Sequence, residues 1–209
     1  MCQLINALDT VIREHPGLEP RLAYCWRGMD AEATDHQIAD FHQRLTRAVR
    51  RRSPDLELIR GIIVEIIHTW GGISNYEGLA DRYPRLLLEL DEDHPVSTQA
   101  VTPISSWSKV LAAYDPERYN IYDSRVAAAL RFLIPDTRWF LPVPHGANRQ
   151  ALFGHFGRRG QLSQADSYAL YLDLLHETGD PLGSERRLFM FGGLLWFDEA
   201  LQTVVLDIP

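Results

Sequence analysis

Three observations predict an all-α fold. Apolar residues recur at steps of three and four along most of the 209-residue chain, which is the period of one face of an α-helix. Residues typical of helix starts and stops flank these stretches. We find no convincing strand alternation of apolar and polar residues. With 45% hydrophobic and 23% charged residues, the chain has the composition of a protein that buries a core.

The clearest predicted helix runs from Leu56 to Trp70, with Ser53 and Pro54 as its expected cap and first turn and Gly71-Gly72 as its stop. A long connection over 135–160 is of the length at which loops are often functional. Together the elements predict one domain, 1–209, of two helical lobes around a cleft. The other helices are expected over 2–14, 35–50, 75–90, 105–114, 124–134, 164–178 and 184–202.

Charge limits the partners of this protein. Its 21 basic and 28 acidic side chains give a net charge of −7, which disfavours non-specific binding to polyanions. Nucleic-acid binding therefore requires a local basic face. One candidate is the arginine-rich helix end over 44–52, for which a solvated helix end is the more ordinary interpretation. The second is the glycine-rich loop, where Arg149, Arg158 and Arg159 alternate with aromatic residues, as in sites that stack nucleobases beside phosphates.

The sequence also predicts where the protein resides and what it lacks. The N-terminus is too polar for a secretory signal, and the longest uncharged apolar run is about half a membrane span. Two cysteines cannot form a disulfide scaffold. His36 and His42 are spaced poorly for sharing a metal ion from one helix face. We therefore expect a cytoplasmic protein with no membrane contact, no metal and no cofactor.

The basic residues contain one exception. Twenty of them are arginine, and only Lys109 is lysine. Arginine serves wherever charge or phosphate contact suffices, but it does not lose its proton in proteins and so cannot be an amine nucleophile. Lys109 is therefore a candidate for amine chemistry. The alternative is a solvated surface lysine.

The segment 103–126 places an acid close to this lysine in sequence. A short helix carries Lys109 near its first turn, the Asp115-Pro116 turn follows, and an extended piece over 119–122 leads to Asp123. Asp123 is well suited to cap the next helix, because its carboxylate can accept hydrogen bonds from free backbone N–H groups. A purely structural cap is the alternative to a catalytic role.

This segment resembles the core of the helix-hairpin-helix DNA glycosylase superfamily, in particular its 8-oxoguanine glycosylase/lyase-like branch. The resemblance covers about residues 103–130, with looser similarity in the apolar C-terminal helix. It implies that Lys109 is the nucleophile, Asp123 the catalytic aspartate and Arg125 a substrate-phosphate contact. It also implies a DNA partner. Short forms of this kind are similar to glycosylase-like proteins encoded near bacterial phage-defence systems, which implies partner proteins of such a system.

The chain departs from the family at the hairpin. Where the family has glycines that approach a DNA phosphate, this chain has Ser105 and Trp107, whose Cβ atoms would hinder that approach. These two residues therefore occupy the expected phosphate-contact positions, and Trp107 is also a candidate for stacking on an extruded base. The separation of Lys109 and Asp123 is shorter than in the best-known members.

The two side chains suit the cleavage of an N-glycosidic bond. An ionised carboxylate beside the sugar stabilises its developing positive charge, and a neutral amine can attack C1′ and later form a Schiff base. Burial beside Trp107 and Val110 would favour the neutral amine. We therefore expect a DNA N-glycosylase with a possible AP-lyase step.

Two alternatives stay open. The first is an N-glycosidase that acts on a nucleoside, nucleotide or RNA, whose binding would depend less steeply on salt for a small substrate. The second is a non-catalytic all-α module that binds a partner protein, with Lys109 and Asp123 as a structural ion pair.

Overall fold

The computed structural model describes residues 3–90, 103–142 and 162–197. Within these ranges, every assigned element of secondary structure is a helix. The only β-type pairing there is an isolated bridge between Trp26 and Met29. The prediction of an all-α fold is therefore confirmed. The elements are α1 (Gln3–Glu14), η1 (Glu19–Leu22), α2 (Ala31–Val49), α3 (Leu56–Val64), η2 (Glu65–Trp70), α4 (Glu77–Leu88), α5 (Ile104–Tyr114), α6 (Ser124–Leu133), α8 (Gln164–His176) and α9 (Pro181–Phe197).

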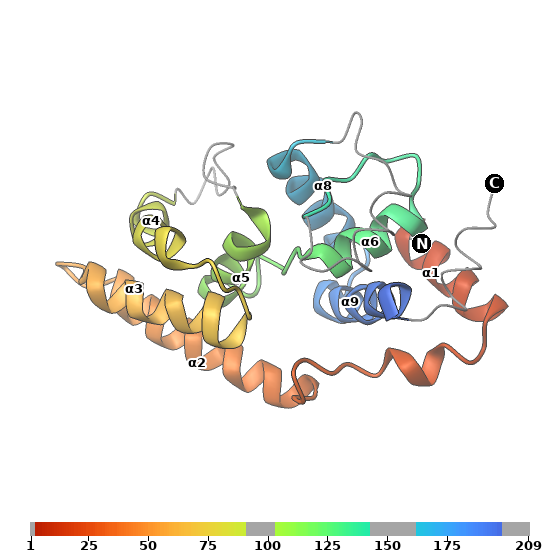
Figure 1. Ribbon diagram of the computed structural model, residues 1–209, viewed down its shortest axis with the longest axis horizontal. Coiled ribbons are helices and arrows are strands. Elements are labelled where there is room, and N and C mark those ends of the chain that lie inside the picture. Colours follow the sequence, from red (N-terminus) through yellow and green to blue (C-terminus); the bar gives the residue numbers. More distant parts are fainter. Residues whose placement is uncertain (1–2, 91–102, 143–161, 198–209) are drawn as a thin grey trace. The chain divides into compact units, whose positions relative to one another are not determined.

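The chain divides into two compact units, Trp26–Ile121 and Met1–Cys25 with Tyr122–Pro209. We call them the middle unit and the terminal unit. The middle unit contains α2, α3, η2, α4 and α5 (Figure 1). The terminal unit contains α1, η1, α6, α8 and α9. A cleft walled by two lobes stays a prediction.

Short polar side chains start most of these helices. Asp30, Asp55, Asp123 and Ser163 each accept a hydrogen bond from a backbone N–H in the first turn of the helix that follows. Asp180 does the same for α9, since its Oδ1 accepts from the N–H of Gly183 at 3.0 Å. These contacts satisfy backbone donors that have no partner inside the helix.

Three predicted helix starts were wrong: those of α2 and α3, and that of α9, which begins at Pro181 and not at 184. Asp55, not Ser53, caps α3, because its carboxylate lies next to the first turn and accepts from Glu57 and Leu58. The next predicted helix boundary, Gly71, is correct, but the last six residues before it form the π-helix η2. Helix α2 begins earlier than predicted, at Ala31, since Asp30 provides its cap. The predicted long connection over 135–160 shows no helix in its described part, 135–142.

In the middle unit, α2 packs against α3 and α5, α3 against α4, and η2 against α5. The core between these helices is apolar and includes Phe41, Leu45, Ile59 and Ile63, all almost fully buried. Helix α5 lies at the centre of this arrangement, and all of its residues from Ser106 to Ala113 are buried. The helix that carries the lysine is therefore buried along most of its length.

In the terminal unit, α9 packs on α6, α8 and η1, and α1 packs on α6 (Figure 1). The closest approach is between α6 and α9, where Gly192 lies against the backbone of Arg125. A Cβ at position 192 would overlap the carbonyl oxygen of Arg125 and lie 2.6 Å from its carbonyl carbon. Only glycine at this position permits the observed contact between the two helices.

Replacing Gly192 with alanine is expected to lower the free energy of unfolding by about 1–3 kcal/mol, because the new methyl group forces α6 and α9 apart. Gly193→Ala is the matched control, since a Cβ there meets only the Cδ of Arg125 at 3.8 Å, an ordinary contact. Alanine at that position should leave stability unchanged or raise it. Urea unfolding followed by circular dichroism measures both variants, and equal midpoints would contradict the close helix crossing.

Candidate active site

Lys109 lies in the second turn of α5, in the middle unit, and its side chain is only 4% exposed. The lysine was predicted near the first turn of a helix that begins at 105. The helix begins one residue earlier, at Ile104, so Lys109 is its sixth residue. Its Nζ donates to the carbonyl oxygen of Ser105 at 2.7 Å and contacts the Ser105 hydroxyl at 3.4 Å. The interpretation of Lys109 as a solvated surface lysine is therefore wrong.

The neighbours of Lys109 on α5 are buried as well. Trp107 and Val110 are both 0% exposed, while the expectation that they line the lysine amine stays a prediction. The indole of Trp107 packs against Tyr83 of α4, with ring centroids 4.8 Å apart. This contact is core packing, and a role for Trp107 or Ser105 against a substrate stays a prediction.

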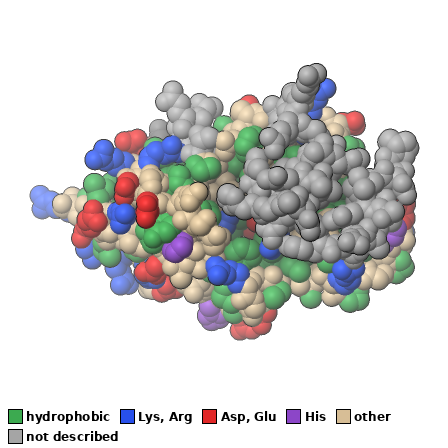
Figure 2. Space-filling model, in the orientation of Figure 1, with side chains coloured by type: hydrophobic (Ala, Val, Ile, Leu, Met, Phe, Trp, Pro, Cys, Tyr) green, Lys and Arg blue, Asp and Glu red, His purple; other side chains and the backbone are tan. Residues whose placement is uncertain are grey.

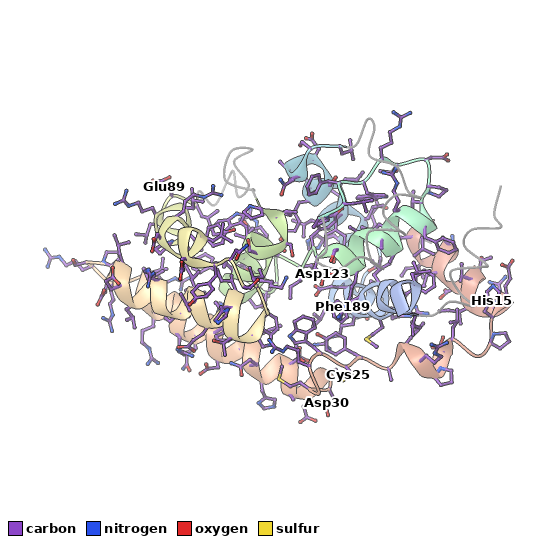
Figure 3. The ribbon with its side chains drawn as sticks, in the orientation of Figure 1. His15, Cys25, Asp30, Glu89, Asp123 and Phe189 are labelled. Atoms are coloured by element: carbon purple, nitrogen blue, oxygen red, sulfur yellow. The ribbon has the colours of Figure 1, made fainter. Side chains whose placement is uncertain are left out.

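Asp123 caps α6 in the terminal unit, as predicted, and is 8% exposed (Figure 3). Its Oδ1 accepts from the N–H groups of Arg125 at 2.9 Å and Val126 at 3.1 Å. Both cap bonds end on the same oxygen, and they fix the plane of the carboxylate at the helix N-terminus.

The terminal unit brings two further polar groups near Asp123 that the sequence did not single out. Tyr171 of α8 is fully buried, and Glu185 of α9 is 9% exposed. Burial raises the pKa of Tyr171 well above its usual value, and the negative charges of Glu185 and Asp123 raise it further. Tyr171 is therefore a neutral phenol close to both carboxylates. No periodicity or motif could have grouped these three residues, which come from three segments of the chain.

Arg125 has a contact that the sequence did not predict. Its guanidinium lies over the ring of Phe189 on α9, 4.5 Å from the centroid, in a cation–π arrangement. Figure 3 labels Phe189 on this helix. The contact anchors the arginine within the terminal unit, while its role as a phosphate contact stays a prediction. Arg149, Arg158 and Arg159 lie outside the described residues.

The basic helix end at the turn between α2 and α3 is partly neutralised. Arg44 forms ion pairs with Asp40 at 3.0 Å and Glu65 at 2.8 Å, and these carboxylates raise its pKa. The remaining arginines of this end are exposed, and Figure 2 shows basic and acidic side chains together in this region. They are Arg47, Arg50, Arg51 and Arg52.

The expected absence of a metal site can be examined on the described part of the chain. There, no three histidine, cysteine, aspartate or glutamate side chains are grouped so that they could hold a metal ion. His36 is exposed, and its Nε2 lies 3.9 Å from the carboxylate of Glu32. The Nδ1 of His42 is hydrogen-bonded to the carbonyl oxygen of Tyr114 at 2.7 Å. Within the same ranges, no helix combines the length and the apolar character needed to cross a membrane.

The structure places the candidate residues in different units. Lys109 belongs to the middle unit, and Asp123, Arg125, Tyr171 and Glu185 belong to the terminal unit. Lys109 and Asp123 are both buried polar groups on packed helices. The pairing of the lysine with the aspartate stays a prediction. No family model matches the chain, and neither the curated proteins nor the solved structures contain a significant match to it.

Two substitutions of Asp123 separate its cap from its charge. Asp123→Ala removes the acceptor for both N–H groups and is expected to lower the free energy of unfolding by about 1 kcal/mol. Asp123→Asn keeps an oxygen acceptor, and asparagine caps helices about as well as aspartate, so its stability should stay close to that of the wild type. Thermal unfolding measures both variants. Equal losses in the two would show that the charge, and not the cap, stabilises the fold.

Proposed function

We propose that this protein is a DNA N-glycosylase with an associated AP-lyase step, in which Lys109 is the nucleophile and Asp123 the stabilising acid. The observation that carries this proposal is the burial of the only lysine in the sequence, at 4% exposure, on a helix that is buried from Ser106 to Ala113. Burying an ammonium group is costly. An exposed arginine or lysine would serve a merely structural or solubilising purpose at lower cost.

Burial also supports the chemistry. Removal from water disfavours the charged form of an amine, and a neutral amine is the nucleophile that the reaction requires. In the proposed first step, the Nζ of Lys109 forms a bond to C1′ of the nucleotide. The electron pair of the N-glycosidic bond leaves with the base, which takes up a proton, and the attacking amine loses one.

Asp123 has the character needed for the opposite task. Its carboxylate is held at the N-terminus of α6 by two hydrogen bonds to Oδ1, so it requires little reorganisation during the reaction. A fixed negative charge beside the sugar stabilises the cation that develops as the base departs. In the following step, the opened sugar and Lys109 form a Schiff base, a proton leaves C2′ and the 3′ phosphate departs.

Two further features are consistent with a DNA substrate. Arg47, Arg50, Arg51 and Arg52 form an exposed basic end of the middle unit, and such side chains bind phosphates without reading sequence. Arg149, Arg158 and Arg159 are further candidates for phosphate contacts. A role in DNA repair or in bacterial antiviral defence, with partner proteins of a defence system, extends the same proposal.

Borohydride trapping tests the proposal directly. We expect the full chain to form a covalent adduct with DNA that contains an abasic site, because borohydride reduces the Schiff base to a stable amine. Lys109→Gln should abolish the adduct. Asp123→Asn retains the cap. On DNA that still carries the damaged or modified base, this variant should form the adduct about 10²–10³-fold more slowly.

The control variants use the fact that Lys109 is the only lysine in the sequence. Besides Lys109, the only other primary amine is the N-terminal one, which Lys109→Gln leaves in place. Thermal unfolding verifies that the variants are folded, and Lys109→Met provides a second substitution that avoids a buried polar amide. Equal adduct yields from wild type and both Lys109 variants would contradict the role of Lys109. Absence of any adduct from wild type would remove the lyase step, and base release without an adduct would then point to water activated by Asp123.

A further inference from the structure

The helix that starts at Leu56 changes its geometry before it ends. After α3, residues Glu65–Trp70 form the π-helix η2, and the N–H of Gly71 donates to the carbonyl oxygen of Ile66 at 2.8 Å. The N–H of Ile73 reaches further back, to Ile67, at 2.9 Å. Such wide turns cost backbone regularity and occur frequently at functional sites. This one packs against α5, the helix that carries Lys109.

Gly71 is the point of contact between the wide turn and the lysine. Its φ of −79° and ψ of −16° are accessible to every residue, so backbone conformation does not require glycine here. Space does. A Cβ at this position would lie 2.9 Å from the Cδ of Lys109, and 2.7 and 2.8 Å from the carbonyl oxygens of Ile66 and Ile67. A side chain at this position would therefore displace both the carbonyl groups of the turn and the lysine stem.

Arg27 holds the end of this turn from the other side. Its Nη1 donates to the carbonyl oxygens of Thr69 at 2.8 Å and Trp70 at 3.4 Å, which lie at the helix end where carbonyl groups lack helical partners. Arg27 itself has a φ of 52° and is followed by Gly28 with a φ of 86°. A left-handed arginine is a strained backbone feature, and such features persist where the surrounding contacts fix them.

The other end of the lysine side chain is also fixed. Its Nζ donates to the carbonyl oxygen of Ser105, while the methylene at Cδ faces Gly71. A free lysine stem samples many rotamers, but contacts at Cδ and at Nζ select one. The wide turn therefore acts on where the amine lies, although no atom of the turn takes part in the chemistry.

We propose that Gly71 is a positioning residue that fixes the Lys109 amine in its reactive orientation. It lies at the end of the π-helix, whose last carbonyl groups accept hydrogen bonds from Arg27. This inference rests on the proposed function for its catalytic consequence, but its structural part can be measured without any substrate. Gly71→Ala is the decisive variant. Gly61→Ala is the matched control, since Gly61 lies on α3 of the same unit and a Cβ there meets nothing within 4 Å.

The single lysine makes the measurement unambiguous. Biosynthetic labelling with [¹³C]lysine gives one ¹³Cε–¹Hε cross-peak from this chain, and we expect Gly71→Ala to shift it and Gly61→Ala to leave it in place. The rate of borohydride trapping on abasic DNA should fall by about 10–100-fold in Gly71→Ala, as for a misplaced catalytic group. The KM for the DNA should change little, because Gly71 contacts the lysine stem and is proposed to affect the position of the amine, not the binding of DNA.

A second variant keeps the inference testable if Gly71→Ala does not fold. In Arg27→Asn, the asparagine tolerates the left-handed backbone conformation, but the hydrogen bonds to the carbonyl oxygens of Thr69 and Trp70 are lost. This variant should shift the same cross-peak and slow trapping. A folded Gly71→Ala or Arg27→Asn protein whose lysine cross-peak coincides with that of the wild type would overturn the inference. If wild type forms no adduct, the proposed function loses its lyase step, while the cross-peak still decides whether Gly71 positions the lysine.

Discussion

The arrangement of the middle unit depends on the burial of one amine. Lys109 lies on a helix whose residues from Ser106 to Ala113 are all buried, and a charged ammonium group there would be strongly disfavoured without compensation. The structure compensates at close range, through the carbonyl oxygen of Ser105 and through a glycine that makes room for the stem. The π-helical turn meets the lysine stem at Gly71, and Arg27 donates to the last carbonyl groups of that turn.

The terminal unit holds the candidate acid, Asp123. Asp123 is held by the first N–H groups of α6, and α6 is fixed by its close crossing with α9 at Gly192. Because Arg125 is in the first turn of α6, the contact with Gly192 lies directly beside the cap and helps to fix the position of the carboxylate. The neutral phenol of Tyr171 and the carboxylate of Glu185 complete a buried acidic neighbourhood. In both units, a glycine lies in close contact with the residue or helix that carries a candidate group: Gly71 with Lys109, and Gly192 with Arg125 of α6.

Local features of the sequence predicted much of this, and tertiary contacts account for the remainder. The helices follow from apolar periodicity, Lys109 stands out because every other basic residue is arginine, and Asp123 precedes a helix as a capping residue should. The cap of α3 was predicted at Ser53, whereas Asp55, two residues later, provides it. The role of Gly71 was missed because Gly71-Gly72 also reads as an ordinary helix stop. Its contact with Lys109 joins distant segments, as does the proximity of Tyr171 and Glu185 to Asp123.

The most direct test of the central claim is a crystal structure of the full chain covalently trapped by borohydride on abasic DNA. We predict continuous electron density from the Nζ of Lys109 to C1′ of the sugar, with the carboxylate of Asp123 within about 4 Å of the same sugar. Density that joins the sugar to the N-terminal amine, or an Asp123 carboxylate directed away from the sugar, would contradict the account.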